Sequence, residues 1–444
     1  MSEVRVNNLS NENNTGGPTI SGITTYSGRH FFVPPSGTTA ERPSDCEPGS
    51  LRFNTDSAHL EYYKGDTIGW VEIEASSDEL GGGTGSNAGV GHRMLLAGGR
   101  SSPPAFTNEI EYLTIPTLGN TQDFGDLTRG SGNQAQTGAG SRTRGVWAGG
   151  QTNSPVVFDN TIDFVTFSST GNASNFGDLS NRVIGNSQLS NNIRGLSFSG
   201  NANPANITQI DAITMAAESN AFDFGDLSQY RNGIGACAST TRGLMVAGTV
   251  SPSRVNTIEF VTIMSMGDSQ DFGDLSQYRN YMGACASTTR GLMVGGTVAP
   301  SRVNTIEFVT IMSTGDSQDF GDLAVTTNAG NTQVYNSICA SNATRGIVFG
   351  GRDSLNNPTN TIQFITIATT GNSIEFGDVT SGYQQMGGSS STRAVIASGV
   401  GDPGSSQNII EFVEIATTGN AADFGDCTAR DENLGACSNG HGGL

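Results

Sequence analysis

Two consecutive segments of this chain, 228–275 and 276–323, are nearly the same sequence and differ only at residues 233, 234, 247, 251 and 266 and their counterparts 48 positions later. Weaker copies of the same unit extend from about Ser86 to the C-terminus, which makes seven in all. Self-similarity at a period of roughly 20–50 residues is typical of folds built from one repeated supersecondary unit. The chain is therefore expected to fold as a series of similar units, each of which buries its apolar surface against its neighbours.

Three short markers recur seven times. The first is an arginine and a small residue before an apolar run that ends in glycine: Arg93, Arg144, Arg194, Arg242, Arg290, Arg345 and Arg393. The second is an asparagine before an apolar run of the type TIEFVTI, as at Asn256 and Asn304. The third is the DFGDL motif, with phenylalanines Phe124, Phe176, Phe224, Phe272, Phe320, Phe376 and Phe424 and aspartates Asp126, Asp178, Asp226, Asp274, Asp322, Asp378 and Asp426.

Each unit contains four strand patterns, which in 276–323 are GACAS, RGLMVGG, TIEFVTI and DSQDFGDL. Four strands in about 48 residues, repeated seven times, predict an all-β fold, a seven-bladed β-propeller of four-stranded blades. A β-helix would have a shorter period, and an array of β-sandwiches would need about twice as many residues per unit. The repeats begin with a second strand and the chain ends with a first strand, so Gly435–Ser438 is expected to complete the first blade.

Composition supports many short strands and excludes several classes of partner. Glycine accounts for 61 residues, charged residues for only 14%, and the net charge is −19 with Lys64 as the sole lysine. A nucleic-acid surface needs clustered basic residues, so nucleic acid is not an expected partner. No apolar run reaches about 18 residues, and we expect no membrane span.

The segment before the repeats predicts three further regions. We assign 1–48 to an extended N-terminal attachment arm, 49–75 to a small β-meander, 76–86 to a Gly-rich linker, and 87–444 to the propeller. The meander is too small to be stable alone. Its apolar residues therefore need another surface, and a homo-oligomer formed through the head is expected, with Phe53, Tyr62 and Trp70 as its oligomer and attachment residues.

Four of the six cysteines, Cys237, Cys285, Cys339 and Cys437, fall in GAC or an equivalent sequence of the first strand. A cysteine multiplied by duplication is better explained as a small buried side chain than as a disulfide partner. No metal-ligand spacing is present, and the sequence predicts no metal and no cofactor.

The seven arginines and seven aspartates of the markers have two interpretations. The aspartates could form a ring of carboxylates that binds calcium. Alternatively, turn capping or an Asp–Arg hydrogen bond between blades repeats in every unit, and we favour this because ligand sites are usually asymmetric. We therefore treat residues such as Arg144, Arg242, Arg290, Asp126 and Phe224 as structural. No catalytic motif is recognisable, and no enzyme activity is predicted.

Binding is expected on the loops between the second and third strands and on the connections between units, because these vary while the strands repeat. Aromatic, proline and arginine side chains there could hold a sugar or a neighbouring protein. The candidate residues are Pro103, Phe106, Phe158, Tyr230, Arg254, Tyr278, Tyr281, Arg302, Tyr335 and Tyr383.

Two family resemblances add to these expectations. The glycine doublet that ends the second strand, the aromatic residue in the fourth and the strand order resemble kelch-type propeller repeats. The match is partial, since the tryptophan of the kelch fourth strand is replaced by the phenylalanine of DFGD, and the doublet is a single glycine at Gly200 and Gly399.

The segments RVNNLSNENNTGGPTISGIT and GSLRFNTDSAHLEYYKGDTIGWVEIEA resemble the N-terminal region of virion structural proteins of tailed phages, especially cyanophage-like ones. The resemblance covers residues 1–75 and implies a tail, neck or capsid fibre or spike protein. Its expected location is the virion, assembled in the cytoplasm of the host bacterium. Its expected partners are other virion proteins and a host surface glycan or protein. Two alternatives are a glycan-binding or glycan-degrading propeller and an intracellular kelch-like scaffold.

Overall fold

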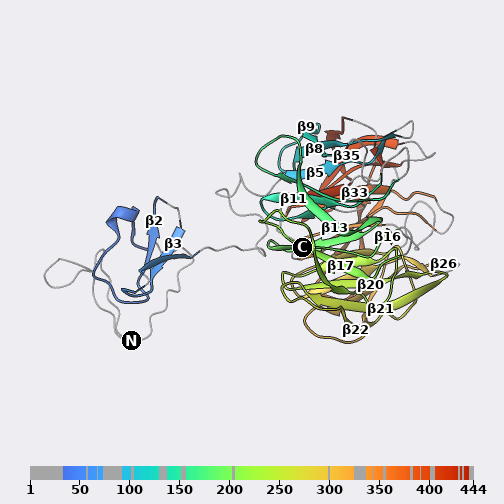
Figure 1. Cartoon of the computed structure of the whole chain (residues 1–444). Helices are drawn as coiled ribbons and strands as arrows, with labels where there is room; N and C mark the ends of the chain where they lie inside the picture. Colours follow the sequence, from blue (N-terminus) through green and yellow to red (C-terminus); the bar gives the residue numbers. More distant parts are fainter. Residues whose placement is uncertain are drawn as a thin grey trace, which may run out of the picture. The chain divides into compact units, whose positions relative to one another are not determined.

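The computed structural model describes residues 34–56, 59–67, 69–73, 93–101, 105–129, 138–151, 157–202, 206–298, 301–324, 337–342, 344–353, 357–380, 384–390, 392–400, 406–428, 431–432 and 435–439. The chain divides into two compact units, Met1–Ser76 and Ser77–Leu444. Both are β-structures (Figure 1), and one 3-10 turn, η1 (Thr39–Glu41), is the single helical element in the described ranges. No helix in this part of the chain is long and apolar enough to cross a membrane.

The first unit is one sheet in the order β1-β2-β3-β4. Strands β2 (Leu51–Asn54), β3 (His59–Tyr63) and β4 (Trp70–Ile73) are antiparallel and lie within the segment 49–75 that the sequence assigns to a small β-meander. Strand β1 (Ser36–Gly37) adds to β2 in parallel. Residues assigned by sequence to the arm therefore contribute a strand and the turn η1 to this unit.

Within the described residues of the second unit, seven sheets share one antiparallel strand order. We number them sheet 1 to sheet 7 along the chain. Sheet 1 is β38 (Gly435–Ser438), β5 (Arg93–Ala97), β8 (Glu109–Thr114) and β9 (Gln122–Asp126). Sheet 2 is β10 (Ala139–Gly140), β11 (Arg144–Ala148), β12 (Asp159–Thr166), β13 (Ser174–Ile184) and an added β16 (Asn201–Ala202). Sheet 3 is β14 (Ser187–Ser190), β15 (Arg194–Phe198), β17 (Gln209–Thr214) and β18 (Phe222–Asp226).

The remaining sheets follow the same plan. Sheet 4 is β19 (Gly235–Ala238), β20 (Arg242–Val250), β21 (Ser253–Thr262) and β22 (Gln270–Asp274), and sheet 5 is β23 (Gly283–Ala286), β24 (Arg290–Val294), β27 (Thr305–Thr310) and β28 (Gln318–Asp322). Sheet 6 is β29 (Ile338–Ser341), β30 (Arg345–Phe349), β31 (Thr361–Thr366) and β32 (Ile374–Asp378), and sheet 7 is β33 (Gln384–Ser389), β34 (Arg393–Val400), β35 (Ser406–Glu414) and β36 (Ala422–Asp426). Short ribbons β25 (Thr297–Val298) with β26 (Ser301–Arg302), and β37 (Asp431–Glu432) with β6 (Arg100–Ser101) and β7 (Ala105–Phe106), lie in the connections.

The core of the second unit lies between neighbouring sheets. Seven clusters of buried apolar residues each join one sheet to the next, for example Leu244 and Ile258 of sheet 4 with Met293 and Val309 of sheet 5. One of these clusters joins sheet 7 to sheet 1. This arrangement explains the apolar second and third strands, because both of their faces are covered.

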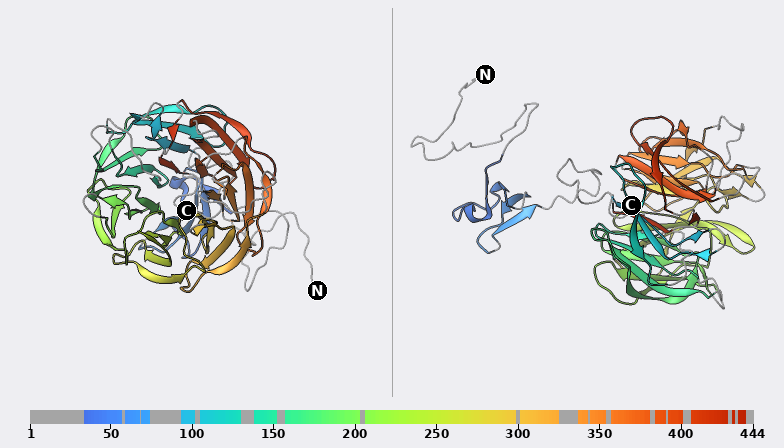
Figure 2. Two further views of the ribbon diagram at one scale, coloured as in Figure 1. Left: turned by 90° about the vertical axis from the view of Figure 1, so that its right-hand side faces the viewer. Right: turned by 90° about the horizontal axis from the view of Figure 1, so that it is seen from above.

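The strand Gly435–Ser438 pairs antiparallel with β5, from Gly435 opposite Ala97 to Ser438 opposite Met94. Trp147 of sheet 2 is fully buried, and its indole N–H donates to the carbonyl oxygen of Gly435 at 3.2 Å. In Figure 2 (left) the sheets follow one another around a centre in chain order, and the red sheet lies beside the cyan one. The two ends of the repeat region are therefore joined by main-chain hydrogen bonds.

Candidate functional site

The loop face is the surface formed by the connections between sheets and by the loops between second and third strands. The isolated bridges Asn232–Thr249 and Asn280–Thr297 join a connection to such a loop in sheets 4 and 5. The structure describes seven of the ten predicted binding residues here: Phe106, Phe158, Tyr230, Arg254, Tyr278, Tyr281 and Arg302. Pro103, Tyr335 and Tyr383 lie outside the described residues.

Two tyrosines at equivalent positions of the duplicated units differ in their surroundings. The hydroxyl of Tyr230 donates to Oδ1 of Asn201 at 2.6 Å and accepts from the side-chain amide of Asn232 at 3.2 Å. The side chain of Tyr278 is 61% exposed. The connections of sheets 3 to 5 therefore bring part of the predicted set together. Phe106 lies in the short ribbon strand β7 and Phe158 in an isolated bridge with Gln151, and both are half-buried.

Arg254 lies beside the connection that leads into sheet 5. Its Nε donates to Oδ1 of Asn280 at 2.9 Å, and the amide of Asn280 donates to Oγ1 of Thr249 at 2.6 Å. Because Asn280 is buried at 4% exposure, this hydrogen bond holds the guanidinium of Arg254 against the body of the sheet. The next residue in the chain is Tyr281, which is 46% exposed.

The seven repeated arginines form bonds between neighbouring sheets. Each guanidinium donates through Nη1 to a main-chain carbonyl of the next sheet at 2.6–3.1 Å: Arg93 to Phe167, Arg144 to Met215, Arg194 to Ile263, Arg242 to Ile311, Arg290 to Ile367, Arg345 to Ile415 and Arg393 to Ile115. Each also lies over an aromatic ring of its own sheet, 4.4–5.4 Å from the centroid. Such contacts stabilise by roughly 0.5–1 kcal/mol each at partly exposed sites.

The DFGD aspartates bond through their main chain. The N–H of each donates at 3.0–3.1 Å to a side-chain oxygen in the turn of the next sheet: Asp126 to Asn172, Asp178 to Asn220, Asp226 to Asp268, Asp274 to Asp316, Asp322 to Asn372, Asp378 to Asn420 and Asp426 to Asn120. The expected contact between sheets therefore exists, but its partners differ from the predicted Asp–Arg pair. Each aspartate lies on the fourth strand of a different sheet, so the seven do not converge on one ion.

The buried polar residue of the third strand was not anticipated from the sequence. It accepts the main-chain N–H of the residue directly after the DFGDL motif, or its variant, of the preceding sheet, at 2.9–3.2 Å: Asp163, Asp211, Glu259, Glu307, Gln363, Glu411 and Glu111. All seven are at most 8% exposed. The signal was available, since this position is polar in every copy of an otherwise apolar strand.

Two of these carboxylates are neutralised by buried arginines. Arg231 pairs with Glu259 and Arg279 with Glu307, and both guanidinium groups are fully buried. Burial lowers the pKa of both arginines, and the carboxylate partner opposes that shift. Asp211 instead accepts from the N–H and hydroxyl of Ser180, and burial raises its pKa despite these bonds. These groups lie inside the body and are structural.

First strands of all seven sheets line one cavity of about 230 Å³. Its lining is mostly glycine, alanine, serine and cysteine, with Gln188 and Leu189 as the larger residues. Cys237, Cys285 and Cys437 occupy equivalent buried positions, but Cys339 pairs with Val348 one step earlier in its strand than Cys285 pairs with Leu292. The prediction that four cysteines share one position is therefore wrong for Cys339. Burial raises the pKa of the Cys237 thiol to about 12. A protonated thiol is a poor nucleophile, and this cavity offers no reactive group there.

The two faces of the head sheet have opposite character. Register places Leu51, Phe53, Leu60, Tyr62 and Val71 on one face, which we call the apolar face; all are half-buried except Leu51, which is 48% exposed. The predicted attachment residues Phe53 and Tyr62 therefore lie together. Trp70 lies on the other face, where its ring contacts that of Tyr63 and its indole N–H donates to the carbonyl of Pro43.

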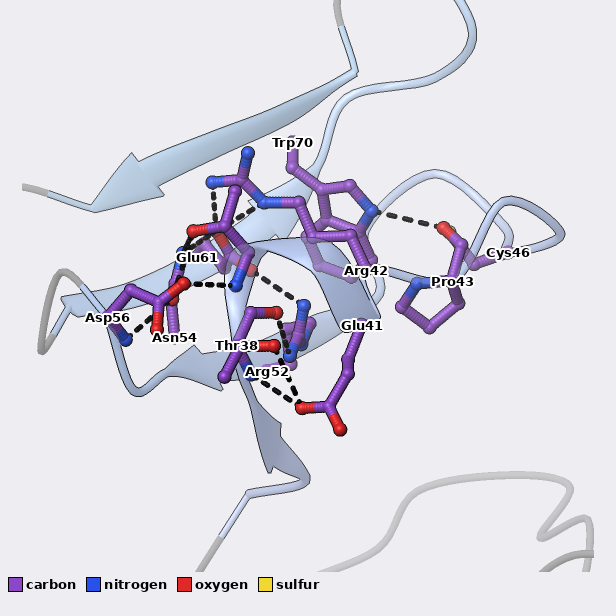
Figure 3. Close-up of polar contacts among 11 residues, drawn as sticks. Thr38, Glu41, Arg42, Pro43, Cys46, Arg52, Asn54, Asp56, Glu61 and Trp70 are labelled. Carbon is purple, nitrogen blue, oxygen red and sulfur yellow. Dashed lines mark hydrogen bonds and ion pairs between the residues drawn. The ribbon is translucent and has the colours of Figure 1, made fainter.

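That other face contains a buried polar cluster (Figure 3). The side chain of Glu61 has no exposed surface. Its carboxylate forms ion pairs with Arg42 at 2.6 Å and Arg52 at 3.2 Å, and it accepts a hydrogen bond from the side-chain amide of Asn54 at 3.3 Å. Burial raises the pKa of Glu61, but bonds from Arg42 and Asn54 and the two positive charges outweigh it, so the pKa is lowered. The segment with Thr38 and Arg42 thus closes this face and leaves the apolar one open within the described part of the head.

In the described ranges, no group of three or more His, Cys, Asp or Glu side chains could hold a metal ion. Comparison with known proteins identified no relative: no protein-family model matches the sequence, and no curated protein matches it.

Proposed function

We propose that this chain is a non-enzymatic virion structural protein of a tailed phage, in which an N-terminal head attaches to the particle and a seven-bladed β-propeller is displayed for recognition. Two observations support the proposed propeller: the pairing of β38 with β5, and the apolar cluster shared by sheets 7 and 1. A closed ring removes the free strand edges that an open array would expose.

One observation supports a recognition role most directly. Three repeated sets of hydrogen bonds join neighbouring sheets: those of the arginines, of the DFGD main chain and of the buried polar residues of the third strand. Variation between units is concentrated in the loops. A rigid body with variable loops on one face is a common scaffold for binding.

The head supports attachment through its apolar face. Exposed contiguous apolar surface on a small sheet is costly in water and marks a site of association. We propose that this face associates with a second copy of the head. The virion assignment itself comes from the resemblance of residues 1–75, and the tail, neck and capsid are its alternative locations.

Two experiments test the proposal. Light scattering of the purified chain should show an oligomer that becomes monomeric in Phe53→Lys, whereas Thr55→Lys, at an exposed turn position, should leave it intact. An unchanged mass for Phe53→Lys would refute the assigned interface. Mass spectrometry and immunogold labelling of purified particles should find the protein on the virion. Its absence from particles, or release of reducing sugar from host glycan by the pure protein, would overturn the function proposed.

A further inference from the structure

The duplicated units 228–275 and 276–323 serve as a control for each other, because they differ at only five positions. The largest difference is Gly233 against Tyr281. Both lie in the connection that enters their sheet, and both have a left-handed backbone, with φ of +61° and +52°. Glycine adopts this conformation freely and a bulky residue does not. The second unit therefore has a tyrosine where its twin has the residue that the backbone prefers.

The ring of Tyr281 lies flat on the twin position. A methyl group added at Gly233 would lie 3.2 Å from Cε1 and 3.4 Å from Cδ1 and Cζ of this ring, and the N–H of Tyr281 donates to the carbonyl of Gly233 at 3.2 Å. The ring is thus supported on one side, while the side chain is 46% exposed. A tyrosine held in this way offers rigid amphipathic contact area at low entropic cost.

Polar groups with open bonding capacity lie in the same connection as Tyr281 and in the hairpin that is hydrogen-bonded to it. The guanidinium of Arg254 is fixed through Nε by Asn280, and its two terminal nitrogens have no hydrogen-bond partner among the described residues. The hydroxyls of Tyr278 and Tyr281 likewise have none in the described ranges, whereas that of Tyr230 in the first unit has two partners. The planar fork of arginine matches a carboxylate.

From this juxtaposition we propose a binding site for a uronic-acid-containing saccharide, in which the sugar ring lies on Tyr281 and its carboxylate binds Arg254. Phenol hydroxyls of Tyr278 and Tyr281 bond to sugar hydroxyls. The polar surroundings, Asn280 and Thr249 among them, suit a hydroxylated ligand better than an apolar peptide side chain. This inference rests on the recognition role proposed for the loop face and specifies its ligand.

Saturation-transfer NMR of the full chain with methyl β-D-glucuronide and the matched methyl β-D-glucoside tests the proposal. We expect stronger binding of the glucuronide. Tyr281→Gly, which restores the residue of the twin unit, should weaken it by at least about tenfold without lowering the thermal midpoint. Arg254→Gln should abolish the preference for the glucuronide. Arg182→Gln, at an exposed arginine of β13 in sheet 2, is the control, and it should bind as the unmodified chain does.

Three results would overturn the proposal: binding of neither sugar at millimolar concentration, equal binding of both, or unchanged binding by Tyr281→Gly. None of them affects the particle location or the mass of the Phe53→Lys variant, because Tyr281 lies outside the head. Failure of the saccharide site and failure of the proposed virion role are therefore distinguishable.

Discussion

At the scale of single residues, the buried ion pairs of the repeats are positions where one substitution is expected to be costly. Arg231 also donates to the carbonyls of Ala247 and Thr257, and Arg279 makes the same bonds one unit later. Breaking a buried pair leaves a charge without compensation, which costs more than the pair contributes.

Glu259→Ala should therefore lower the free energy of unfolding by about 3–5 kcal/mol. Glu307→Ala should cost about the same, because its surroundings repeat those of Glu259. Urea denaturation followed by tyrosine and tryptophan fluorescence measures both. Equal midpoints for the two variants and the unmodified chain would contradict the argument.

Asp211 gives a pH-dependent prediction. Its folded pKa lies above its ordinary value of 3.8, so the folded state binds the proton more tightly than the unfolded chain does. Its contribution to stability is therefore greatest below that value and is lost as the pH rises through the raised folded pKa. Asp211→Asn should remove this dependence, as Gln363 does at the same position of sheet 6. The thermal midpoint of Asp211→Asn minus that of the unmodified chain should increase from acid to neutral pH. A difference that does not change with pH would contradict a raised pKa for Asp211.

At the scale of elements, the DFGD strand and the turn of the next sheet approach closely. Gly273 has φ of +143°, and a Cβ there would lie 2.5 Å from the carbonyl carbon and oxygen of Gly315. Only glycine allows this contact. The third residue of the DFGD motif is therefore required by packing between sheets as well as by its own backbone.

Gly273→Ala should be strongly destabilising, by more than about 1 kcal/mol, because it adds a clash with main chain to a strained φ. Gly315→Ala is the matched control: its φ is +151° and a Cβ there meets nothing within 4 Å. Calorimetry should show a larger fall in midpoint for Gly273→Ala. Equal decreases in the thermal midpoints of the two variants would mean that the close approach of Gly273 to Gly315 does not affect stability.

The sequence predicts the elements better than it predicts their contacts. The runs around Met293 and Phe308 predict β24 and β27 because apolar and β-branched residues recur at fixed spacing. The partner of Arg290 was not predictable, because it is the main-chain carbonyl of Ile367 in another unit. Every residue has such a carbonyl, so the sequence does not indicate which one accepts. The exposed ring of Tyr281 was identified as a candidate, but its support on Gly233 depends on the fold.

At the scale of the whole molecule, the last described strand connects the two ends of the repeat region. Deletion of residues 435–444 removes β38 and the acceptor of Trp147, and leaves β5 with an unpaired edge. The shortened chain should unfold at a lower temperature and aggregate, because exposed edges pair with other chains. Deletion of residues 440–444 alone retains β38 and is the control. Scanning calorimetry with light scattering measures both, and equal behaviour would show that this strand contributes little.

The pairing of Gly435–Ser438 with β5 also sets an order of events during synthesis. Domains generally fold as they leave the ribosome, N-terminal parts first. The strands β5, β8 and β9 of sheet 1 are translated before the other six sheets, yet the sheet lacks one strand until Gly435–Ser438 has emerged. Sheet 1 therefore stays incomplete while the strands of the six other sheets emerge from the ribosome.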